Sequence, residues 1–167
     1  MEDILNLIKA RKSVRSYTDK EVSKETMEKI VEAGLYAPTA RNWQNILIVG
    51  IVDQDVINAI HSHFGTEGNY YGAKALILTF ETREDHLSDL NDGAAIQNML
   101  LEATSLGVNS CWVHSSVKSF DTEEGREYLK ELLHLEAAYR PLDTIALGYE
   151  TEEPSGRERN EGNVIVL

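Results

Sequence analysis

The chain has 167 residues, of which 42% are hydrophobic and 26% are charged, and this composition excludes wholly disordered and collagen-like proteins. Its 16 basic and 28 acidic side chains give a net charge of −12, which opposes binding to nucleic acid or to anionic lipid. It has one cysteine, no signal-peptide pattern and no apolar run of the ~20 residues that a membrane span needs, so we expect a single cytoplasmic domain over residues 1–167.

Amphipathic helices and apolar strands alternate along the chain. The spacing of apolar residues predicts a short helix near residues 4–8 and longer helices over 23–37, 53–64, 88–106 and 122–134. Continuous apolar runs predict strands buried on both faces over 46–52, 75–80, 108–113 and 142–149. The alternation predicts a central sheet covered by helices on both faces, and on its own it favours parallel strands.

The end of the chain is polar over residues 150–162 and apolar over 163–167, which read NVIVL. A segment this apolar is not expected to remain free in solvent. The pattern leaves two alternatives open. Either the segment adds a strand at the edge of its own sheet, or it is an arm that completes the sheet of a partner subunit.

Several common chemistries lack their sequence signatures. The chain contains no G-x-G-x-x-G, P-loop or G-x-S-x-G motif, and one cysteine excludes a cysteine-based zinc site. His61 and His63 are two residues apart on a predicted helix and therefore face different ways, so we expect no metal site there. Cys111 lies inside an apolar strand and is expected to be a buried hydrophobe. His114 ends that strand, either as a proton donor or as a polar residue that lines a cleft.

A basic cluster stands out in this acidic protein. Residues 9–18 carry Lys9, Arg11, Lys12 and Arg15 and no acidic side chain. The cluster is either a solvated helix end or an anion site. Arg11, Ser13 and Arg15 alternate, so in an extended segment they point to the same side. Two guanidinium groups and one hydroxyl on one side suit a phosphate and an electron-rich carbonyl.

Three later segments complete a pattern. Residues 37–45 read APTARNWQN, and their amides can pair with ring carbonyls and ring N–H groups. Residues 92–103 read DGAAIQNMLLEA, a helix with a stretch of small side chains. Residues 147–149 read LGY and are followed by Pro154, Arg157 and Arg159.

In this order the four segments resemble the motifs of the FMN-dependent nitroreductase family, over about residues 4–160. They are similar to its R-x-S-x-R, A-P-S-x-x-N-x-Q-P-W, D-x-G-x-A-x-Q-N-x-L-L-x-A and L-G-Y…P…R motifs. The resemblance implies an α+β fold, a three-layer α-β-α sandwich around a mixed, largely antiparallel sheet. It also implies a homodimer in which the C-terminal arms are exchanged.

The resemblance further implies a flavin site. Arg11, Ser13 and Arg15 match residues that hold the FMN phosphate, the ribityl chain and the N1/O2 edge, and Lys12 is expected to assist. Further positions are implied to bind the cofactor. They are Pro38, Thr39, Ala40, Asn42 and Gln44, partly toward the partner subunit, then Asn69 at the ribityl chain, His114 and Ser115 near flavin N5, and Arg157 and Arg159 at the phosphate.

The activity implied is that of an FMN-dependent oxidoreductase, in which no side chain is a covalent catalyst and Arg15 stabilises the reduced flavin. NAD(P)H would reduce FMN, and a small electron-poor acceptor such as a nitroaromatic or quinone would then be reduced in a ping-pong sequence. Two alternatives remain: a flavin-binding protein without turnover, or a flavin-remodelling or dehalogenating relative. One departure concerns the site, because Asn45-Ile46 replaces the family's Pro-Trp.

Overall fold

The computed structural model describes residues 4–65, 70–152, 156 and 158–166. Its centre is a sheet of four strands in the order β1-β2-β4-β3, comprising β1 (Ile46–Ile51), β2 (Ala75–Glu81), β3 (Asn109–Trp112) and β4 (Arg140–Gly148). Every neighbouring pair of strands is antiparallel. A parallel bridge between Ser13 and Ser110 at the β3 edge makes the pairing mixed.

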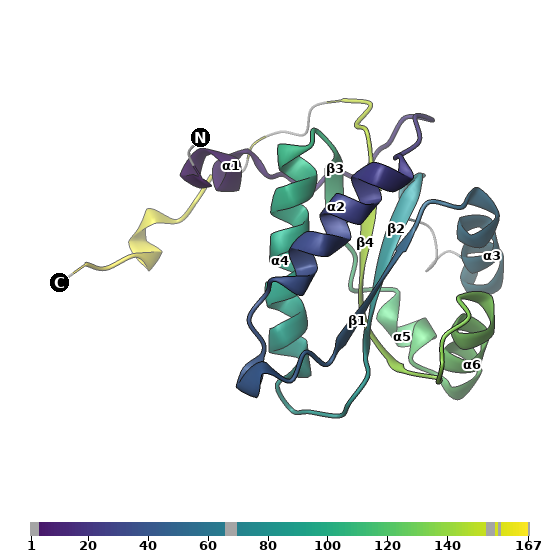
Figure 1. The fold of residues 1–167 in the computed structure, drawn as a ribbon. Helices are drawn as coiled ribbons and strands as arrows, with labels where there is room; N and C mark the ends of the chain where they lie inside the picture. Colours follow the sequence, from purple (N-terminus) through teal and green to yellow (C-terminus); the bar gives the residue numbers. More distant parts are fainter. Residues whose placement is uncertain (1–3, 66–69, 153–155, 157, 167) are drawn as a thin grey trace.

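Helices cover both faces of this sheet (Figure 1). Two helices, α2 (Lys24–Leu35) and α4 (Ser88–Ser105), lie on one face. Three more, α3 (Gln54–Phe64), α5 (Val117–Phe120) and α6 (Glu123–Leu132), lie on the other. The α-β-α sandwich and the largely antiparallel sheet that the resemblance implies are therefore confirmed.

The sheet is apolar on both faces, which explains the continuous hydrophobic runs in the sequence. Along β2, Leu76 and Leu78 belong to the core beneath α3, α5 and α6, whereas Ala75 and Ile77 belong to the core beneath α2 and α4. A strand covered on both sides has the same hydrophobic pattern whichever way it runs. The parallel arrangement that alternation alone favours is therefore wrong, and the sequence pattern held no signal to correct it.

The helix ends follow local side-chain chemistry. The hydroxyl of Ser23 accepts a hydrogen bond from the Thr26 N–H (3.1 Å), and Thr122 caps α6 in the same way. Gly107 ends α4 with a φ of 70°, and the Val108 N–H donates to the Ala103 carbonyl (2.8 Å). These ends lie within a few residues of the predicted ones. The four-residue helix α5 has too few turns to produce a periodic signal.

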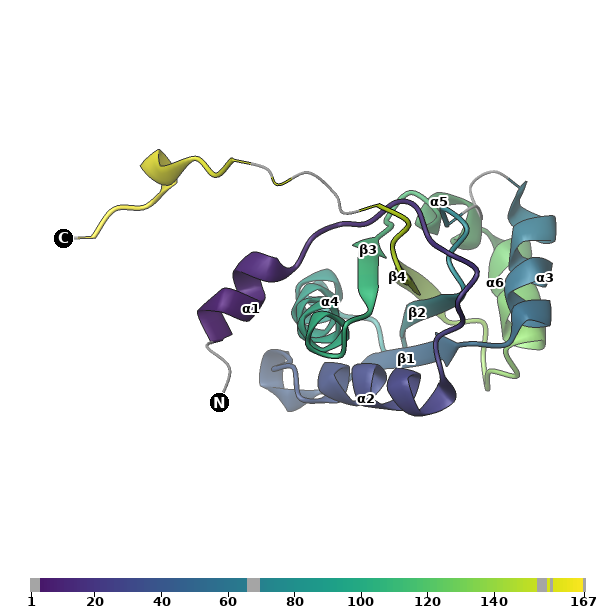
Figure 2. The ribbon, with the colours of Figure 1, turned by 90° about the horizontal axis from the view of Figure 1, so that it is seen from above.

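Two apolar segments project from the body. The first helix, α1 (Ile4–Ala10), and the C-terminal segment with η3 (Glu161–Asn163) extend to the same side, as Figure 2 shows. Val164, Ile165 and Val166 are 72%, 81% and 90% exposed. Among the residues described, none from this segment pairs with the sheet. The alternative of an edge strand in the chain's own sheet is therefore wrong for residues 163–166.

Candidate functional site

The basic segment passes beside β3, where Ser13 forms an isolated bridge with Ser110. The Val14 N–H donates to the Ser110 carbonyl (2.9 Å), and the Tyr17 hydroxyl donates to the Val14 carbonyl (2.8 Å). Val14 is buried, while Arg15 beside it is exposed. Because side chains alternate in an extended chain, Ser13 and Arg15 face away from the core that holds Val14. The burial of Val14 between Ser13 and Arg15 agrees with the predicted alternation at these three positions, while the N–H of Arg11 still donates to the Leu7 carbonyl at the end of α1 (3.1 Å).

Two positive charges gather at this edge of the sheet. Burial raises the pKa of the Cys111 thiol in β3, and the guanidinium groups of Arg15 and Arg11 oppose the rise. Both groups therefore lie within electrostatic reach of the same strand. A hydroxyl and two guanidinium groups along one extended segment are suited in chemistry to a phosphate and a flavin carbonyl edge. The residue types of this segment therefore fit the phosphate and carbonyl groups of FMN.

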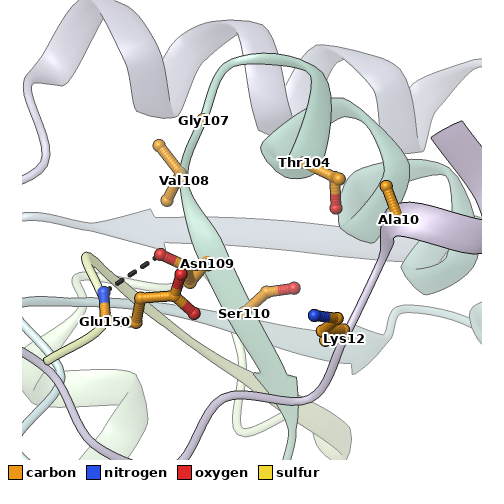
Figure 3. Close-up of a pocket in the computed structure, with 8 residues that line it drawn as sticks. All are labelled: Ala10, Lys12, Thr104, Gly107, Val108, Asn109, Ser110 and Glu150. Carbon is orange, nitrogen blue, oxygen red and sulfur yellow. Dashed lines mark hydrogen bonds between the residues drawn. The ribbon is translucent and has the colours of Figure 1, made fainter. Parts of the chain in front are cut away.

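A cavity of about 280 Å³ lies beside this segment, at the carboxyl end of α4 (Figure 3). The Asn109 carboxamide oxygen accepts a hydrogen bond from the Glu150 N–H at its wall (3.0 Å). Lys12 lines the cavity, where a cation complements the negative end of the helix dipole. Arg11, Ser13 and Arg15 are not among its lining residues. Lys12, which belongs to the basic segment, therefore also lies at the carboxyl end of α4.

The 37–45 segment lies at the opposite end of α4 from residues 11–15 (Figure 1). Asn91 of α4 holds it, because the Asn91 side-chain oxygen accepts a hydrogen bond from the Ala40 N–H (2.9 Å). Arg41, Asn42 and Gln44 all have positive φ angles, between 49° and 56°. Such strain persists only where the surroundings impose it. The structure does not bring this segment to Arg11–Arg15 within one chain.

The predicted residues of this segment differ in exposure. Pro38, Asn42 and Gln44 are exposed, whereas Thr39 and Ala40 are half-buried. The Thr39 hydroxyl accepts a hydrogen bond from the Gln44 N–H (3.0 Å), which closes the loop. The two amide side chains are therefore presented outward. They are available to a ligand or to a second subunit.

Asn45, at the departure from the family motif, is a buried anchor that sequence analysis missed. Its side-chain amide donates to the Ser88 hydroxyl (2.8 Å) and to the Arg83 carbonyl (3.1 Å), and its oxygen accepts from Asn91 (3.1 Å). The side chain thus ties the 37–45 segment to α4. The guanidinium groups of Arg41 and Arg83 lie over the ring of the adjacent Trp43, at 4.9 and 4.0 Å from its centroid.

His114 and Ser115 lie just after β3, and both are exposed. His114 Nδ1 is 3.0 Å from Asp143 Oδ1, and the Asp143 side chain is buried in β4. Burial raises the pKa of Asp143, while hydrogen bonds from the Trp112 indole and from His114 oppose the rise. The pair between His114 and a buried carboxyl is a feature that the sequence did not indicate.

A second buried carboxyl, Asp92, lies close by in α4. Burial, with smaller contributions from the carboxyls of Asp143 and Asp89, raises its pKa to about 7, against an opposing hydrogen bond with Thr79. Within the described residues, its Oδ1 atom has no hydrogen-bond partner. A buried carboxyl with this pKa is half protonated near neutral pH.

Replacing Asp92 with asparagine should therefore stabilise the protein at alkaline pH. The folded pKa lies above the value of 3.8 for an unperturbed Asp, so the wild-type free energy of unfolding falls as pH rises from about 4 to about 7. Asparagine cannot ionise and avoids this loss. We expect Asp92→Asn to raise the free energy of unfolding by about 2–4 kcal/mol at pH 8 and by almost nothing at pH 4, measured by denaturant titration. Glu102→Gln on the same helix is the control, and equal stability of Asp92→Asn and wild type at pH 8 would contradict the account.

Three predicted FMN-binding positions remain. Asn69 and Arg157 lie outside the described residues, and Arg159 is exposed in the projecting C-terminal segment.

His63 stacks on Tyr128 with 3.6 Å between ring centroids, while His61 packs near Tyr70. Within the described part of the chain, no three His, Cys, Asp or Glu side chains are grouped to hold a metal ion. None of the helices described is both long and apolar enough to span a membrane.

Comparison with known proteins gives consistent matches. Two overlapping stretches, residues 8–82 and 58–149, match the model of the nitroreductase family. A protein of Archaeoglobus fulgidus that is provisionally named an NADH dehydrogenase/NAD(P)H nitroreductase is 29% identical over 168 residues, which cover 96% of this chain and 93% of that protein. The FMN reductase (NAD(P)H) of Bacillus subtilis is 22% identical and is covered over 70% of its length by 95% of this chain. A crystal structure of a nitroreductase with bound FMN from Bacteroides fragilis has a TM-score of 0.85 at 26% identity, with 100% of each chain covered.

Proposed function

The chain belongs to the nitroreductase family and has the nitroreductase fold, and we propose that it is an FMN-dependent NAD(P)H oxidoreductase. The acceptors would be small electron-poor molecules such as nitroaromatics or quinones, reduced in a ping-pong sequence. The observation that supports the proposal is the basic segment beside β3, where Ser13 bridges Ser110 and the guanidinium groups of Arg15 and Arg11 both act on the Cys111 thiol. The buried, unpaired Cys111 is compatible with a reducing compartment such as the cytoplasm.

Each part of the site has an assigned task in this proposal. Arg11 and Ser13 would bind the FMN phosphate and ribityl chain, assisted by Lys12 and by the late basic residues Arg157 and Arg159. Arg15 would lie at the N1/O2 edge and stabilise the negative charge of the reduced ring. When bound, FMN accepts a hydride from NAD(P)H and passes it to the acceptor. The protein supplies binding, orientation and electrostatic stabilisation.

We also propose that the working unit is a homodimer, because the two segments predicted to contact the flavin, residues 11–15 and 37–45, lie at opposite ends of α4. Residues 37–45 present Asn42 and Gln44 far from Arg11–Arg15, so they would serve the flavin bound mainly by the partner. Large apolar side chains are exposed on the elements that a partner would cover. They are Ile4, Leu5 and Ile8 of α1, Leu35 and Tyr36 at the end of α2, Leu90 of α4, and Val164, Ile165 and Val166.

Steady-state oxidation of NADH and of NADPH, with and without a nitroaromatic or a quinone, tests the activity. We expect purified protein to oxidise at least one nicotinamide faster when an acceptor is present. Protein that binds FMN but shows no acceptor-dependent oxidation would instead be a flavin-binding protein without turnover. Slow reduction of both acceptor classes, with faster conversion of a halogenated aromatic or of FMN itself, would favour a remodelling or dehalogenating relative.

A further inference from the structure

Two guanidinium groups lie over one indole ring in the loop that follows α2. The guanidinium carbons of Arg41 and Arg83 are 4.9 and 4.0 Å from the centroid of the Trp43 ring. The two arginines come from separate segments, because Arg41 belongs to residues 37–45 and Arg83 to the turn after β2. Both arginines are exposed, whereas Trp43 is half-buried. The ring therefore gathers two positive charges at one place on the surface.

No acidic side chain neutralises these two charges within the described part of the chain. There, Arg41 and Arg83 contact the Trp43 ring and make no ion pair. Arg140 differs, because its guanidinium group donates to Glu81 (2.7 Å) and to Asp89 (3.1 Å). In a protein with a net charge of −12, two such guanidinium groups over one ring form a local site for an anion.

A buried amide keeps the two segments together. The Asn45 side chain, which is 2% exposed, donates a hydrogen bond to the Arg83 carbonyl (3.1 Å). The Asn45 carbonyl accepts a hydrogen bond from the Thr82 N–H (3.0 Å). These bonds use the backbone of the turn, so the Arg83 side chain stays available to a ligand. The fold therefore brings the two arginines together before any ligand binds, which lowers the cost of binding.

A cavity adjoins the arginine pair. Arg83, His86 and Tyr139 are among the residues that line a cavity of about 600 Å³, a volume typical of sites for small molecules. Glu84 lies on the same wall and opposes an anion there, whereas the Asp85 carboxylate is 3.0 Å from the His86 imidazole. A ligand that binds to the arginines thus has room to extend beyond them.

We propose that Arg41, Trp43 and Arg83 bind the 2′-phosphate and the adenine of NADPH, so that the protein prefers NADPH to NADH as its electron donor. This inference rests on the proposed function, in which residues 37–45 serve the flavin bound mainly by the partner. A phosphate monoester carries about two negative charges at neutral pH and accepts paired hydrogen bonds from guanidinium groups. Adenine stacks on guanidinium and indole planes. NADH has the adenine but lacks this phosphate, so the arginine pair discriminates between the two donors.

The first test measures binding without turnover. In calorimetric titrations of the purified protein, adenosine 2′,5′-bisphosphate should bind at least about 10-fold more tightly than adenosine 5′-monophosphate. In the double variant that combines Arg41→Gln with Arg83→Gln, the two nucleotides should bind within about twofold of each other. Equal affinities in the wild type, or an unchanged ratio in the double variant, would overturn the inference. Displacement of the bisphosphate by an equal concentration of inorganic phosphate would overturn the assignment to a nucleotide.

The second test compares the two donors in steady-state kinetics. The double variant should raise the KM for NADPH about 10- to 100-fold and leave kcat within about twofold of wild type, because the lost contact is far from the reacting nicotinamide ring. The kcat/KM for NADH should also stay within about twofold. An equal loss with NADH and NADPH would contradict a contact to the 2′-phosphate, which NADH lacks.

A second double variant controls for net charge. Lys24→Gln combined with Lys29→Gln removes the same two positive charges from α2, where the lysines lie 4.0 Å from Glu28 and 2.8 Å from Glu25. It should leave the affinity for both nucleotides and the kinetics with both donors within about twofold of wild type. An equal loss of the preference for the bisphosphate in this control would show a general effect of charge and would overturn the site.

These outcomes separate the inference from the proposed function. Protein that binds FMN and oxidises NADH and NADPH equally well would refute the inference and leave the proposed function intact. Protein that takes up no FMN, or that oxidises neither donor, would refute the proposed function. The nucleotide titrations would still decide whether the arginine pair binds the phosphate.

Discussion

Replacing Arg11 with alanine should weaken FMN binding by about 30- to 1,000-fold. Removing one guanidinium from a partly buried phosphate contact costs about 2–4 kcal/mol, because the phosphate loses a charge-assisted pair of hydrogen bonds. Arg11 is half-buried beside β3, so bulk solvent cannot fully replace it. Fluorescence titration of flavin-free protein with FMN measures the change.

Arg15→Ala should weaken FMN binding for a different reason and should also lower the reduction potential of the bound flavin. The reduced ring is anionic and loses its counter-charge, whereas the oxidised ring loses little. Arg126→Ala is the control. It removes an arginine of α6 that pairs with Asp121, and it should leave FMN affinity and the reduction potential of the flavin unchanged. If Arg11→Ala and Arg15→Ala both retain wild-type affinity, the basic cluster is only a solvated helix end.

Deleting residues 160–167 should abolish the dimer and most FMN binding together. The arm exposes Val164, Ile165 and Val166, and burying these three side chains on a partner contributes about 4–9 kcal/mol before the cost of ordering the arm. A dozen extended residues reach about 40 Å, which is enough to cross a domain of this size. Sedimentation analysis and flavin content measured on the same sample give the result.

A full-length variant shows whether the deletion acts by shortening the arm or by removing its apolar side chains. Replacing Val164, Ile165 and Val166 with asparagine keeps the arm but removes its hydrophobic surface, and it should dissociate the dimer as the deletion does. The net charge of −12 on each chain opposes association, so the apolar contact has to outweigh a screened repulsion. A deletion variant that remains dimeric and fully loaded with FMN would disprove the exchanged arm.

Local signals in the sequence predicted most of the fold. Ser23, Thr122 and Gly107 set helix ends through bonds to residues within a few positions, so their chemistry can be read directly. Strand direction depends on which distant strands pair. β2 pairs with β4 far along the chain, and its all-apolar pattern is the same for either direction. Only the family resemblance predicted the antiparallel sheet.

The candidate site was predictable only in part, for the same physical reason. The alternation of Ser13, Val14 and Arg15 is a local pattern, and the burial of Val14 beside the exposed Arg15 agrees with it. The contact between Asn45 and Asn91 joins residues 46 positions apart, and that between His114 and Asp143 spans 29 positions. No periodicity reports such contacts. The replacement of the family's Pro-Trp by Asn45-Ile46 marked position 45 as unusual, but the sequence did not indicate the buried hydrogen bonds that Asn45 makes.

The central claim is that this chain binds FMN and uses it to carry electrons from a nicotinamide. The visible absorbance spectrum of the purified protein, recorded before and after anaerobic addition of NADH or NADPH, tests it most directly. We expect yellow protein with oxidised-flavin absorbance that is bleached by at least one of the two donors. Colourless protein that takes up no FMN on titration, or bound flavin that neither donor bleaches, would contradict the account.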